Sequence, residues 1–103
     1  MGIMNLIDLF REIKDEHLGR QALEKYEQKL AGLYAEMQVE IGSLKKERAL
    51  YFLERQRPEV TDISIRRQWD AIPNGQRLIE LEANVKAVAR MYSSVRSRIY
   101  QSL

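Results

Sequence analysis

The chain has 103 residues, of which 45% are hydrophobic and 31% are charged, and its formal net charge is +2. This composition argues against a disordered chain, and the lack of cysteine excludes disulfide scaffolds, thiolate catalysis and Cys-ligated zinc. A single histidine excludes a histidine cluster for a metal or a catalytic triad, and the few glycines and prolines argue against a β-sandwich or barrel. We therefore expect a small, mostly helical protein that is not an enzyme and needs no cofactor or metal.

The same features predict where the protein works. No apolar run approaches the roughly 18 residues of a transmembrane helix, and the start of the chain lacks the pattern of a secretory signal. We therefore expect no membrane partner and a cytoplasmic location, which is the host cell cytoplasm if the protein is viral.

Two helices are predicted in the first half of the chain. Residues 3–16 predict a short amphipathic helix, because Ile3, Leu6, Ile7, Phe10 and Ile13 recur at helical spacing. Residues 20–57 predict a long helix that Pro58 ends, because proline disfavours the helical conformation of the residue before it. Its apolar stripe is close to a heptad repeat and contains Leu23, Tyr26, Leu30, Leu33, Met37, Ile41 and Leu44.

Two further helices are predicted after a connector at residues 58–61. Thr61 or Asp62 is suited to cap a short helix over residues 62–71. The residues Ile72-Pro73-Asn74-Gly75 favour a kink or short break, although Pro73 also suits the first position of the next helix. That last helix, over residues 76–102, has an uninterrupted heptad stripe of Leu78, Leu81, Val85, Val88, Tyr92, Val95 and Ile99.

Together these elements predict a single all-α domain, a long antiparallel helical hairpin with a short N-terminal helix. A thin hairpin buries one stripe per helix, so we expect further apolar side chains to stay exposed on one copy; they are Ile3, Leu6, Phe10, Tyr34, Phe52, Trp69 and Ile79. Burial would then be completed between copies. We therefore expect a homo-oligomer that the stripe of residues 78–99 assembles.

The charge distribution gives the best indication of a ligand. Residues 1–44 sum to −3 and residues 45–103 to +5. Basic residues bracket the connector, and this basic cluster contains Lys45, Lys46, Arg48, Arg55, Arg57, Arg66 and Arg67. Cations bind phosphates, and nearby Tyr51 and Trp69 are suited to stack on unpaired bases. The alternative is a solvated charged face with the two aromatic rings in the core.

Two stretches of the chain resemble the UvsY-like recombination mediators of T-even and related phages. In the first, the pair Leu33-Tyr34 precedes the run Ser43-Leu44-Lys45-Lys46-Glu47. In the second, the last helix runs through Ser94-Val95-Arg96-Ser97-Arg98. The order of a long helix, a basic connector and a second long helix is also similar. In the zone of the family's DNA-contacting motif this chain has Leu53-Glu54-Arg55-Gln56-Arg57-Pro58, where only Arg55 and Arg57 supply cations.

The resemblance implies a ring-like homo-oligomer that binds single-stranded DNA. It further implies a mediator that helps a RecA-like recombinase replace single-strand-binding protein, without catalytic activity of its own. Two other classes stay open from the residues themselves. One is a small helical protein–protein adaptor or inhibitor, such as a viral protein that occupies a host factor. The other is a helical subunit of a larger nucleoprotein complex.

Overall fold

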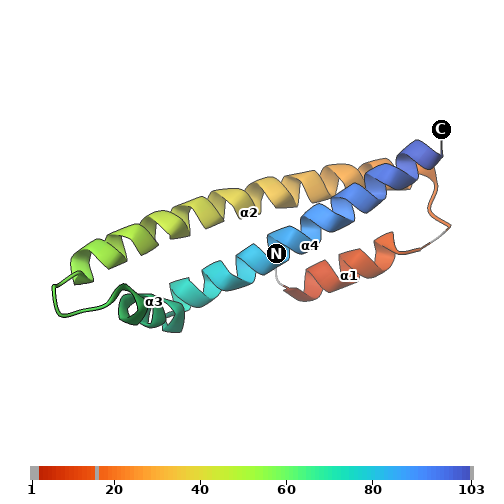
Figure 1. Cartoon of the computed structure of the whole chain (residues 1–103). Helices are drawn as coiled ribbons and strands as arrows, with labels where there is room; N and C mark the ends of the chain where they lie inside the picture. Colours follow the sequence, from red (N-terminus) through yellow and green to blue (C-terminus); the bar gives the residue numbers. More distant parts are fainter. Residues whose placement is uncertain (1–2, 16, 103) are drawn as a thin grey trace. The chain divides into compact units, whose positions relative to one another are not determined.

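All regular structure in the described part of the chain is helical. The computed structural model describes residues 3–15 and 17–102, and for residues 3–5 it describes the backbone alone. The described residues form four helices and no strand, and Figure 1 labels the helices in chain order. The helices are α1 (Ile3–Ile13), α2 (Arg20–Arg55), α3 (Asp62–Ala71) and α4 (Pro73–Gln101). The expectation of an all-α protein is confirmed.

The chain divides into two compact units. Unit 1 comprises Met1–Tyr34 and Ala87–Leu103, and unit 2 comprises Ala35–Lys86. Unit 1 therefore holds α1, the first part of α2 and the last part of α4. Unit 2 holds the rest of α2, all of α3 and the first part of α4.

In unit 1, the side chains of three helices form an apolar core. Buried members are Leu6, Leu9 and Ile13 of α1, Leu23, Leu30 and Leu33 of α2, and Val88 and Val95 of α4. The buried face of α1 includes Leu9, which the sequence did not single out, whereas Ile7 is 42% exposed. Ile3 was also expected on this face, but its side chain lies outside the described residues.

Polar contacts in unit 1 hold the end of α1. Arg98 donates hydrogen bonds to the backbone carbonyls of Ile13 and Asp15, so carbonyls left free at the end of the helix have a partner. Tyr26 donates its hydroxyl to Oε2 of Glu12 at 3.1 Å. Burial and this hydrogen bond to Glu12 raise the pKa of Tyr26. The helix predicted over residues 3–16 ends at Ile13, and Glu16 lies outside the described residues.

Unit 2 is built on the predicted stripe of α2. Met37, Ile41 and Leu44 are buried, as are residues of α3 and α4 in the same unit: Ile65, Trp69, Leu78, Leu81 and Val85. Arg77 of α4 donates from Nε and Nη2 to the two carboxylate oxygens of Glu40 on α2, both at 3.0 Å. Nearer the end of α2, Nδ2 of Asn74 donates to Oε2 of Glu47 at 2.7 Å.

Prolines and a polar cap set the helix ends of unit 2. α2 ends at Arg55, three residues before Pro58, which has no amide hydrogen to continue the helical ladder. Thr61 is the N-cap of α3, where its hydroxyl accepts a hydrogen bond from the Ser64 amide at 3.1 Å. The short helix spans residues 62–71, the range expected from the sequence.

The junction between α3 and α4 is tighter than the break favoured from the sequence. Ile72 alone separates the two helices, with φ −86° and ψ 158°, the extended conformation that a following proline favours. Pro73 is the first residue of α4, so the alternative placement of this proline is the correct one. Two residues later Gly75 packs so closely on α3 that an added Cβ would lie 1.8 Å from the Trp69 carbonyl oxygen.

None of the helices in the described residues combines the length and the apolar character needed to span a membrane. Exposed apolar side chains occur on several helices, with the largest exposed fractions at Val39 (76%), Ile63 (68%) and Leu53 (66%). Two side chains that were expected to stay exposed, Leu6 and Trp69, are buried within the one chain, at 3% and 2%.

Candidate nucleic-acid interface

All seven residues of the basic cluster lie in unit 2. Lys45, Lys46, Arg48 and Arg55 are on α2, Arg57 is in the connector, and Arg66 and Arg67 are on α3. Arg48 and Arg55 are half-buried and the other five are exposed. Most of the cluster is therefore accessible to a large anionic ligand.

Few of these cations are neutralised within the chain. Arg66 pairs with Asp70 at 3.9 Å and Arg55 with Glu54 at 3.5 Å, and exposed pairs of this kind are weak. Within the described part of the chain, no carboxylate lies within ion-pair distance of the cluster's other members. Four of those are also exposed, namely Lys45, Lys46, Arg57 and Arg67. Their charge is available to a partner.

The cations do not form one continuous strip. Successive residues of a helix point about 100° apart, so Lys45 and Lys46 diverge on α2, as Arg66 and Arg67 do on α3. A ligand would have to follow the outside of both helices rather than occupy a single groove.

Trp69 is not available as a stacking group, and that prediction is wrong. The indole is 2% exposed, because Trp69 lies one turn after Ile65 on the buried face of α3. Its ring meets the ring of Tyr51 edge-on, with centroids 5.5 Å apart. A base can stack on Trp69 only if α3 leaves the core of unit 2.

Tyr51 is half-buried and partly covered. The guanidinium of Arg55 lies 3.5 Å from the ring centroid, a cation–π contact between residues one turn apart on α2. Arg55 also donates to the Tyr51 carbonyl oxygen at 3.4 Å. Because Arg55 covers one face of the Tyr51 ring and Trp69 lies beside the ring, a base would meet the Arg55 guanidinium before it met that face of the tyrosine.

The hollow beside these aromatic residues is acidic. It has a volume of about 250 Å³, and Glu47 and Glu54 line it together with Tyr51, Trp69 and Asn74. Two carboxylates repel phosphate, so the hollow itself is a poor place for a nucleic-acid backbone. The described residues also contain no group of three or more His, Cys, Asp or Glu side chains that could hold a metal ion.

The stripe that was expected to assemble copies is buried within the chain. Leu78, Leu81, Val85, Val88 and Val95 are at most 9% exposed, and Tyr92 and Ile99 are half-buried. A second copy can reach the five buried members only if α4 leaves its own core. The role of the stripe in assembly stays a prediction, and its burial shows that it already packs inside one chain.

Unit 1 holds basic residues that the sequence did not single out as a site. Arg96 lies 5.8 Å from the ring centroids of both Tyr92 and Tyr100, which precede and follow it by one turn of α4. A hydrogen bond to the Tyr100 hydroxyl raises the pKa of Arg96, so the guanidinium stays charged. The sequence signal for this group is the spacing of four residues between Tyr92, Arg96 and Tyr100, which places the three on one side of a helix.

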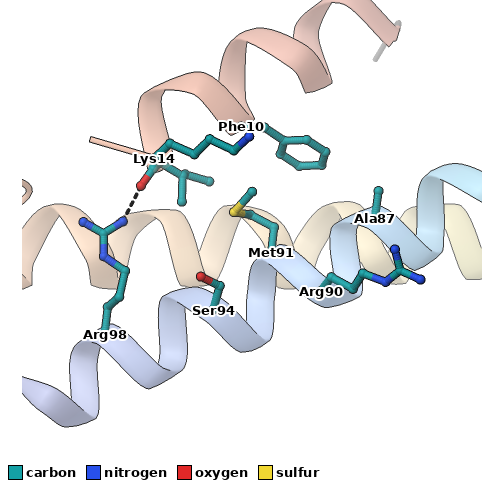
Figure 2. A pocket seen from close by; sticks show the side chains of 8 residues that line it. Phe10, Lys14, Ala87, Arg90, Met91, Ser94 and Arg98 are labelled. Atoms are coloured by element: carbon teal, nitrogen blue, oxygen red, sulfur yellow. Dashed lines mark hydrogen bonds between the residues drawn. The ribbon is translucent and has the colours of Figure 1, made fainter. Parts of the chain in front are cut away.

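A second basic group in unit 1 surrounds a larger hollow, of about 620 Å³. Lys14, directly after the end of α1, and Arg90 and Arg98 of α4 line it (Figure 2). The sequence shows that Lys86, Arg90, Arg96 and Arg98 follow Glu82 with no further acidic residue, which left open either a solvated helix end or an anionic partner. The part that Lys14 contributes depends on how α1 packs, which periodicity alone does not predict.

Comparison of the chain with protein-family models, curated proteins and solved structures found no match.

Proposed function

We propose that this chain binds single-stranded DNA through the basic cluster of unit 2, by contacts with phosphates rather than with particular bases. One observation carries the proposal: Lys45, Lys46, Arg57 and Arg67 are exposed and have no carboxylate partner in the described structure. By contrast, Arg77 of the same unit is held by Glu40. Unpaired, exposed cations on helices bind a polyanion without reading its sequence.

The role within the cell that we propose follows from the resemblance to UvsY-like mediators. The chain would help a RecA-like recombinase replace single-strand-binding protein on DNA in the cytoplasm, without catalysis of its own. One copy offers few phosphate contacts, so the protein would act as a homo-oligomer that pools the basic clusters of several copies. The face of α2 with Val39, Leu50 and Leu53, each at least 59% exposed, is a more accessible assembly surface than the buried α4 stripe; Lys46 lies on the same face, so assembly there would place this cation beside the contact between copies.

The proposed fold of each copy is an antiparallel helical hairpin of α2 and α4. Two contacts in unit 2 support this arrangement: Glu40 meets Arg77, and further along α2 Glu47 meets Asn74, which comes earlier in α4. A hairpin would place the basic ends of α2 and α3 on either side of the connector at residues 58–61. DNA bound there would contact both helices.

The test is the affinity for a fluorescein-labelled oligothymidylate, measured by anisotropy over a range of salt concentrations. The variant Lys45→Glu/Lys46→Glu/Arg67→Glu should lose most of the binding. At salt concentrations where binding is still measurable, the slope of log K against log salt should shrink by about 2, because each contact with a single strand contributes about 0.7. The matched control is Lys25→Glu/Lys29→Glu/Lys86→Glu, which changes the net charge equally at three exposed positions outside the cluster.

The control should keep most of the affinity and the wild-type slope. An equal loss in both variants would show that net charge alone attracts the DNA, and the basic cluster would lose its assignment. Wild-type binding that is absent, or that does not respond to salt, would overturn the proposal.

A further inference from the structure

The larger hollow of unit 1 is a groove between α1 and α4 that the proposed DNA interface does not use. Its volume of about 620 Å³ lies within the range of ordinary ligand sites. Apolar lining comes from Phe10 and Ile13 of α1 and from Ala87 and Met91 of α4. Figure 2 shows Phe10 and Met91 reaching from their two helices towards the space between them. The groove shares no residue with the basic cluster of unit 2.

The polar lining of this groove is cationic. Lys14, Arg90 and Arg98 line it, and no acidic side chain is among the described residues that do so. Arg98 is already bound to the carbonyls of Ile13 and Asp15, so it positions α1 on α4. Lys14 and Arg90 are exposed and form no ion pair with any described residue. These two cations are free to meet an anionic partner.

The α4 residues that line the groove lie on one face of the helix. Ala87, Met91, Ser94 and Arg98 succeed one another by four, three and four residues, which covers three turns, or about 17 Å of helix. A groove of this length with adaptable apolar residues such as methionine suits the apolar face of another helix, which places its anchors at the same intervals.

We propose that this groove binds an acidic amphipathic helix of a partner protein. The partner's apolar face would lie on Phe10 and Met91, and its flanking Glu or Asp side chains would pair with Lys14 and Arg90. Charge complementarity argues for an acidic partner, and the largely aliphatic lining argues for a protein rather than a nucleic acid, whose bases stack on aromatic rings. The inference does not depend on DNA binding at unit 2.

The experiment uses the full chain and a fluorescein-labelled helical peptide of about 14 residues as the probe. Leucines on one face of the peptide repeat at helical spacing, and glutamates flank them; a second peptide has lysine at every glutamate position. The acidic peptide should bind the wild-type chain and the lysine peptide should not. Lys14→Glu/Arg90→Glu should weaken binding of the acidic peptide at least about tenfold and should create binding of the lysine peptide.

Two controls make the result specific. Lys25→Glu/Lys29→Glu makes the same change in net charge at exposed positions of unit 1 that do not line the groove, and it should bind the acidic peptide like wild type. Met91→Gln should weaken binding of the acidic peptide without changing its salt dependence. Circular dichroism on each variant should show wild-type helicity, since Lys14 and Arg90 are exposed and Arg98 is left in place.

Three results would overturn the proposal. The first is equal binding of the two peptides to the wild-type chain, and the second is equal weakening of the acidic peptide by the groove and control variants. The third is displacement of the bound peptide by the oligothymidylate together with loss of DNA binding in Lys14→Glu/Arg90→Glu, which would assign the groove to nucleic acid. A failure of DNA binding at unit 2 alone leaves these measurements unaffected.

Discussion

The backbone φ of Gly75 is not positive, so its conformation does not require glycine. Glycine is required at this position because there is no room for a side chain. A Cβ there would lie 1.8 Å from the Trp69 carbonyl oxygen and 2.6 Å from the carbonyl carbon, and these backbone atoms cannot turn aside. We expect Gly75→Ala to force α3 and α4 apart and to lower the free energy of unfolding by about 1–3 kcal/mol. Urea unfolding followed by circular dichroism measures this.

Gly42 supplies the matched control, since it lies within α2 and an added Cβ would meet nothing within 4 Å. Gly42→Ala should raise the free energy of unfolding by about 0.5–1 kcal/mol, the usual gain when alanine replaces glycine inside a helix. If Gly75→Ala were as stable as wild type, the close approach of the two helices at this residue would be wrong.

Near the connector, residue type predicted the exposure of the lysines but not that of the tryptophan. Lys45 and Lys46 were expected at the surface and are exposed. Trp69 stands two residues after Arg67 in the sequence, which suggested a stacking group, yet it is 2% exposed. The spacing of Trp69 from Ile65 contained the necessary information, because two large apolar residues one turn apart on a short helix define its buried face. Proximity to basic residues along the chain carried no information about which way the ring points.

At the scale of elements, periodicity predicted the helices and their apolar stripes. The stripe of α2 from Leu23 to Leu44 is buried apart from Tyr26, which is half-buried. Helix ends were less predictable, because they depend on contacts made elsewhere. α1 ends early at Ile13, where Arg98, more than 80 residues further on, binds the carbonyls of Ile13 and Asp15. Ile72 is the one residue between α3 and α4, and its backbone is extended, so α4 begins directly after it at Pro73.

The pairing of α2 with α4 through Glu40 and Arg77 predicts a dependence of stability on pH. The hydrogen bonds from Arg77 lower the pKa of Glu40 in the folded protein. The pair therefore adds stability above the ordinary glutamate pKa of about 4.3, and this stability is lost as the pH falls through the lowered pKa. Because the side chains of Arg77 and Glu40 are 39% and 44% exposed, the contribution is at most about 1 kcal/mol.

We expect Glu40→Gln to be less stable than wild type near pH 7, and the difference to close in acid. Urea unfolding of both proteins over the acid range checks this. Glu36→Gln is the control, because Glu36 is exposed and pairs with no described cation. A difference for Glu40→Gln that persisted to the lowest pH would mean that the variant loses packing rather than an ion pair.

At the scale of the whole molecule, the expected excess of apolar surface is only partly present. Leu6 of α1 and Trp69 of α3 are buried inside the chain, so fewer apolar side chains stay exposed than expected. Tyr34 and Ile79 stay exposed as expected, at 41% and 54%, and further exposed apolar residues lie on α2. Val39, Leu50 and Leu53 are 76%, 59% and 66% exposed, and their spacing of eleven and three residues places them on one face of α2. This face, rather than the buried stripe of α4, is where contacts between copies would add burial.

If copies assemble through this face, Val39→Ser/Leu53→Ser should reduce the mass measured by light scattering to that of one chain, 12.1 kDa, without loss of helicity. Ile63→Ser/Ile79→Ser is the matched control, because these residues are 68% and 54% exposed on α3 and α4, and it should keep the wild-type mass. Leu81→Ser should instead unfold the chain, because Leu81 is 1% exposed. If the wild-type protein has the mass of one chain both with and without the oligothymidylate, assembly is excluded. Each DNA site would then consist of the cations of one copy.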